Sequence, residues 1–133
     1  MDNNGLSPAQ LDAVLAFLPI LSAHGYIFGV WHAEPGEMPY FAHSPEVEQF
    51  IASLYAQNVI IKFDWCAWRE PANALLQDPT LLAQADLLTL RRLLTAHVRQ
   101  DRFIEGHLAQ MLENGHITAI LRRLGELRAG LTG

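Results

Sequence analysis

Apolar residues recur at helical spacing through the last third of the chain. The first run comprises Leu87, Leu90, Leu93, Leu94 and Val98, and the second comprises Ile117, Ile120, Leu121, Leu124 and Leu127. Steps of three and four residues place such side chains on one face of a helix, which is then buried against a core. The sequence therefore predicts helices from Asp86 to Arg99 and from Ile117 to about Ala129. A third is predicted from Asp101 to Leu112, closed by Gly115.

The N-terminal half carries strong helix-start signals. Ser7-Pro8-Ala9-Gln10 combines an N-cap serine, a proline at the first helical position and a glutamine three residues after the cap, which completes a capping box. We expect this helix to run toward His24, with a kink or break near Leu18 because Pro19 cannot donate a backbone hydrogen bond. Gly25 then ends it.

Two further helices are predicted in the middle of the chain. Ser44-Pro45 repeats the cap-plus-proline signal and opens an amphipathic helix that ends near Asn58. Asp64 stands at an N-cap position ahead of a helix that stops before Pro79.

Three short runs of aromatic and β-branched residues favour strands. Tyr26–Trp31 and Met38–Phe41 flank a Pro35-Gly36 turn, which predicts an antiparallel hairpin, and Val59–Phe63 is the third predicted strand. The fold class predicted is therefore α+β, mostly α: four to five helices packed with a small three-stranded sheet from the N-terminal half.

Length and composition indicate one domain over residues 1–133, with residues 1–6 and 130–133 expected to be disordered. Half of the residues are hydrophobic, which is enough to build one core without disulfides or metals. Charged residues make up 17%, below the roughly 25% of an average soluble domain. Such a charge-poor chain buries more surface than usual, and we expect a homo-oligomer.

A membrane partner is not expected, because the longest apolar stretch, Ala13–Ala23, is shorter than a bilayer span. The acidic, polar N-terminus does not resemble a secretion signal. The single cysteine, Cys66, excludes an intrachain disulfide. These features predict a cytoplasmic protein.

The stretch Arg99–His107 is the main candidate for a site. It holds Arg99, Arg102, Glu105 and His107 within nine residues. Two neighbouring arginines can clamp a carboxylate or phosphate, and Glu105 or His107 can transfer protons. Within a helix, Gly106 needs a reason such as a ligand close to the backbone. The alternative is an internal ion-pair network in which these groups and Asp64 or Asp101 satisfy one another.

A second candidate lies at the start of the predicted helix after residue 63. Trp65 and Trp68 stand one turn apart beside Asp64, and the two indoles can form walls of a ligand pocket. Alternatively, both tryptophans anchor this helix in the core.

These residues also carry a resemblance that extends from about Phe17 to Leu127. The motif Arg-x-x-Arg-Phe-x-Glu-Gly-His at residues 99–107, with the Asp64-Trp65 pair and Trp68, resembles an uncharacterised bacterial family of small proteins, a domain of unknown function. The resemblance implies no activity, substrate or cofactor. Members often carry cysteine at the position of Ile104, so isoleucine here disfavours a nucleophile at that place.

The leading hypothesis is a binding or accessory module with a pocket for a small polar or anionic ligand. One alternative is a structural homo-oligomer without a small-molecule site, and another is a hydrolase-type enzyme using Glu105 or His107. A third is a nucleic-acid binder, since residues 91–133 carry seven arginines, although the acidic net charge of −5 argues against it. No cofactor is predicted, because phosphate-cradling motifs are absent, and no metal site is predicted either.

Overall fold

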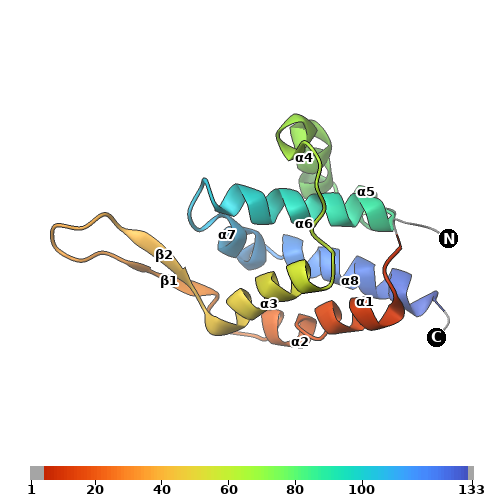
Figure 1. Ribbon diagram of the computed structural model, residues 1–133, viewed down its shortest axis with the longest axis horizontal. Coiled ribbons are helices and arrows are strands. Elements are labelled where there is room, and N and C mark those ends of the chain that lie inside the picture. The colour runs from red at the N-terminus through yellow and green to blue at the C-terminus, as the bar shows by residue number, and fades with distance from the viewer. Residues whose placement is uncertain (1–4, 132–133) are drawn as a thin grey trace.

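The computed structural model describes residues 5–131 and is mostly helical, with one small antiparallel sheet (Figure 1). The helices are α1 (Pro8–Leu15), α2 (Leu18–Leu21), α3 (Pro45–Ala56), the 3-10 helix η1 (Trp65–Trp68), α4 (Arg69–Gln77), α5 (Pro79–Leu82), α6 (Leu87–Asp101), α7 (His107–Glu113) and α8 (His116–Ala129). The strands are β1 (Gly29–His32) and β2 (Tyr40–His43). The class predicted from the sequence, α+β and mostly α, is confirmed.

Helix α8 forms the centre of the core. It lies between α1 and α6 and contacts both, as well as α2, α5 and α7 (Figure 1). Its apolar face, represented by Ile117, Ile120 and Leu124, is fully buried, as the helical spacing predicts.

The helix starts follow the predicted caps. Ser7 Oγ accepts from the backbone N–H of Gln10, and the side chain of Gln10 accepts from the N–H of Ser7, so the capping box is complete. Ser44 caps α3 as predicted, its side chain accepting from the N–H of Val47. The side chain of Asp86, a cap that the sequence analysis did not identify, accepts from the N–H of Thr89 at the start of α6.

The helices are shorter and more numerous than the four to five expected. The first predicted helix is interrupted between Leu15 and Leu18, just before Pro19, as predicted. Pro79 starts a separate helix after α4, with the side chain of Asp78 as its cap.

The predicted helix from Asp101 to Leu112 is wrong, and so is the placement of Gly106 inside it. Helix α6 ends at Asp101, and Gly106 precedes α7 with φ +82°, a left-handed conformation that glycine adopts without strain. A Cβ atom at this position would lie 3.2 Å from Cζ2 of Trp31. Glycine at position 106 therefore allows both the turn before α7 and the close approach of Trp31 from the hairpin.

The hairpin is confirmed, with Trp31 opposite Phe41, but the third strand is wrong. Among residues 5–131 the sheet has two strands. The backbone of residues 59–61 bonds to side chains of α6 instead of a strand: Thr95 Oγ1 accepts from Ile61 N, and Arg91 Nε donates to the carbonyl of Val59. Anchored by these contacts, Val59 is fully buried without a strand partner.

The expected disordered ends, 1–6 and 130–133, fall largely outside the described residues. Leu6 packs into the core, and Gly130 follows the end of α8. Within residues 5–131, no helix combines the length and apolar character needed to cross a membrane.

Candidate functional site

An open groove of about 880 Å³ lies between η1 and α4 on one side and α6, α7 and their connecting loop on the other. In Figure 1, α4 stands above α6. The residues that line it are Trp65, Cys66, Arg69, Glu70, Ala72, Asn73, Leu76, Ala96, His97, Gln100, Phe103, Ile104 and His107. Its size falls in the range of small-molecule pockets, about 300–1,000 Å³.

Two buried imidazoles contribute to this lining. His97 Nδ1 and His107 Nε2 are 3.0 Å apart and share a hydrogen bond. Burial, with repulsion from the neighbouring histidines, lowers the pKa of His97 to about 3. Burial also lowers the pKa of His107, against the opposing effect of Asp101. Both rings are therefore neutral at pH 7, and together they offer polar but uncharged groups in an apolar setting.

A third imidazole continues this cluster behind the groove. The ring of His116 meets that of His97 edge-on, with 5.0 Å between the ring centroids. Burial and the nearby His107 lower the pKa of His116 to about 4. The Nε2 atoms of His97 and His116 are buried and have no hydrogen-bond partner among the described residues.

Aromatic and polar side chains form the mouth of the groove. The rings of Trp65 and Phe103 lie 5.9 Å apart across it, and Phe103 is 76% exposed. Cys66, the only cysteine of the chain, is exposed there. Arg69 lies at the start of α4 and makes no ion pair with any residue between 5 and 131.

Of the seven residues predicted for the site, Trp65 and His107 line the groove. Asp64 caps η1 through the N–H of Ala67, and Trp68 packs against Phe63 beside the core. Trp68 thus has the anchoring position that the sequence left open as an alternative.

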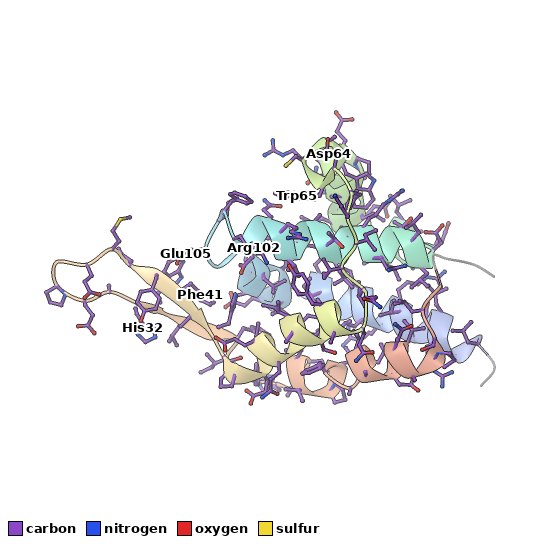
Figure 2. The ribbon with its side chains drawn as sticks, in the orientation of Figure 1. His32, Phe41, Asp64, Trp65, Arg102 and Glu105 are labelled. Carbon is purple, nitrogen blue, oxygen red and sulfur yellow. The ribbon has the colours of Figure 1, made fainter. Side chains whose placement is uncertain are left out.

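The other three predicted residues lie outside the groove. Arg99 and Arg102 both meet Tyr55 of α3: the guanidinium of Arg99 lies 5.8 Å from the ring centroid, and Arg102 Nη2 donates to the hydroxyl at 3.1 Å. Glu105 Oε2 accepts from the N–H of Phe41 at 2.7 Å. Figure 2 shows Glu105 and Arg102 near the hairpin, with Trp65 higher up beside η1.

The alternative prediction, that the charged residues of Arg99–His107 form an internal ion-pair network, is wrong. In the part of the chain that the structure describes, Asp101 pairs with His43 at 2.8 Å, and neither Arg99 nor Arg102 pairs with a carboxylate. Burial alone would raise the pKa of Asp101, but hydrogen bonds from His43 and from the N–H of Leu108 lower it below its usual value of 3.8.

Sequence reasoning missed most of the groove lining, including Arg69, Asn73 and Gln100. One signal was present: His97 falls on the apolar face of α6, where an imidazole needs a polar partner. Across residues 5–131, no group of three or more His, Cys, Asp or Glu side chains is arranged to hold a metal ion.

The fold and groove define a small, mostly helical α+β protein with an open groove beside a cluster of buried histidines. A family model matches residues 6–130, and the chain belongs to this family of unknown function (DUF6508). The motif at residues 99–107 stays a prediction. No curated protein and no solved structure gives a significant match to the chain.

Proposed function

We propose that this protein is a binding module that holds a small organic acid in the groove. The apolar body of the ligand would lie along α4 and α6, and its carboxylate would meet Arg69. The proposal is carried by one observation, the open groove with a buried, neutral imidazole pair in its lining.

The balance of side chains supports this class of ligand. Trp65, Leu76 and Phe103 present apolar surface, which favours binding of a hydrocarbon or aromatic body. Arg69 has no carboxylate partner among the described residues and is free to form a charge-assisted hydrogen bond with an acid. Because His97 and His107 are neutral, an apolar body can cover their rings without the cost of desolvating a charge.

Two of the three alternatives considered from the sequence have less support. Hydrolysis by Glu105 would need that carboxylate in the groove, but Glu105 bonds to the hairpin outside it, and His107, which lines the groove, is hydrogen-bonded to the ring of His97. Nucleic-acid binding through α8 has less support because two of its three arginines are already engaged: Arg123 donates to the carbonyl of Ala85 and to Glu126, and Arg128 pairs with Asp12.

The test is a thermal-shift titration with 3-phenylpropionate and octanoate, each against its own amide. A ligand at ten times its Kd stabilises the folded state by about 1.4 kcal/mol, which raises Tm by several degrees. We expect the acids to raise Tm more than the amides, and both acids to slow alkylation of Cys66 by a maleimide.

Two variants locate the binding. Arg69→Gln should weaken the acids about tenfold while leaving the amides unchanged, since it removes only the charge-assisted bond. Arg122→Gln, on the exposed side of α8, is its matched control. Asn73→Trp fills the groove and should abolish all binding, whereas Ala74→Trp, exposed on the same helix outside the groove, should not. If no compound raises Tm or protects Cys66, or if the filled variant binds normally, the proposal is refuted.

A further inference from the structure

The hairpin projects from the helical body as an arm, defined here as residues 29–43 (Figure 1). An isolated two-stranded hairpin is marginally stable in water at best. This arm also exposes large apolar side chains: Met38 is 86% exposed, Trp31 57% and Val30 50%. Such a surface is typical of a segment that becomes covered by a partner.

The tip of the arm is acidic and is closed by a hydrogen-bonded turn. Glu37 N donates to the carbonyl of Glu34 at 3.0 Å, and Gly36 between them has φ +84°. With Pro35 at the second position, this matches a type II turn, which keeps both glutamates at the tip. Neither carboxylate forms an ion pair with the rest of residues 5–131.

The base of the arm is fixed to the helices by the two acids that flank Arg102. Asp101 binds His43, and Glu105 binds the N–H of Phe41. Both carboxylates point to the hairpin and form no ion pair with Arg99 or Arg102.

Arg99, Arg102 and Tyr55 consequently form a basic patch, named here the Arg–Tyr surface. Both guanidiniums contact the same tyrosine, which is 36% exposed, and neither contacts a carboxylate within the described part of the chain. A guanidinium pair beside a hydroxyl is a good receptor for a carboxylate.

We propose that two copies of this chain form a symmetric dimer in which the acidic tip of each arm binds the Arg–Tyr surface of the other copy. Within one copy the tip lies at the far end of the arm from the helices, so it does not contact the Arg–Tyr surface of the same copy (Figure 1). Two unpaired surfaces of opposite charge on the same chain are complementary between copies, and twofold symmetry makes the contact twice.

Other properties of the chain agree with this partner. The arm would bring Met38 and its neighbouring apolar side chains out of water, and the chain is poor in charge at 17%. The dimer contact uses other residues than the ligand site proposed above, because neither Arg99 nor Arg102 lines the groove.

The experiment is sedimentation equilibrium of the full chain at low and high salt, with charge-reversed variants. Glu34→Lys with Glu37→Lys should raise the dimer Kd about tenfold or more, since it turns each attraction into a repulsion. Arg99→Glu with Arg102→Glu should do the same. The control, Glu48→Lys with Glu113→Lys, changes the net charge equally at exposed positions on α3 and α7 and should leave Kd unchanged.

Mixing the two charge-reversed variants gives the decisive result. Each homodimer contains like charges at both contacts, whereas the heterodimer pairs opposite charges at both, so the mixture should regain wild-type affinity. Circular dichroism of each variant shows that it is folded. Wild-type protein that stays monomeric at about 1 mM overturns the proposal, as that concentration would populate even a weak dimer. A dimer that ignores the reversals, or a mixture without heterodimer, overturns it equally.

Discussion

Acidification from pH 7 to pH 5 should destabilise this protein through its buried histidines. The pKa of His97 is about 3 in the folded state, against 6.5 for a free imidazole, because burial disfavours the charged ring. The unfolded chain therefore takes up protons first. The stability that a neutral His97 contributes is complete above pH 6.5 and is lost progressively as pH falls below it.

The size of this loss follows from the two pKa values. At pH 5, protonation of the unfolded chain at this one residue lowers the free energy of unfolding by RT ln(1 + 10^1.5), or about 2 kcal/mol. His116, with a pKa of about 4, acts in the same direction, but it adds less than the roughly 2 kcal/mol that its two pKa values alone would give, because solvent screens a partly exposed ring. Against a typical domain stability of about 5–15 kcal/mol, the combined effect is large.

Urea denaturation at pH 7, 6 and 5 measures the effect. Asp86 and Asp101 do not interfere, because their pKa values lie below 3.8 in the folded state, so the stability they add is lost only at lower pH. His97→Gln removes one titrating group and should reduce the loss between pH 7 and pH 5 by about 2 kcal/mol, whatever it does to stability at pH 7. The same change at exposed His24 is the control. If His97→Gln loses as much stability on acidification as the wild type, the reasoning is wrong.

Two further predictions concern the contacts that hold the arm on the helices. Gly106→Ala should cost about 1–3 kcal/mol in urea denaturation, since it combines a left-handed φ with a Cβ atom 3.2 Å from Trp31, whereas Gly125→Ala inside α8 should be neutral or stabilising. Asp101→Asn should lower the free energy of unfolding by about 1–3 kcal/mol and speed hydrogen exchange at Leu108 N. The reason is that it weakens the charge-assisted bonds from Asp101 to His43 of β2 and to the N–H of Leu108 in α7. Asp64→Asn should change the free energy of unfolding little, since asparagine is an equally good N-cap. An equal loss of stability in the Asp101 and Asp64 variants would contradict this account.

Local signals predicted most of the helices. The capping box at Ser7 and Gln10 and the caps at Ser44 and Asp86 satisfy backbone donors within three residues, so no distant contact is needed to place them. The prediction of a third strand was wrong because the contacts of this segment are distant in sequence. Its apolar and β-branched residues fit a strand, but the partners of Ile61 and Val59 are side chains of α6, more than thirty residues away.

The candidate site was predictable only in part, for a similar reason. Trp65 and His107 were identified by their residue type and motif, whereas Arg69 and Gln100 line the groove because α4 and α6 lie side by side. The direction in which Glu105 points depends on the free N–H of Phe41, which exists only once the hairpin has formed.

The loop of residues 102–106 belongs to two surfaces at once. On one side Phe103 and Ile104 wall the groove, and on the other Glu105 and Gly106 hold the hairpin. Because the two surfaces share the one segment between α6 and α7, a substitution there acts on the wall of the groove and on the support of the hairpin together.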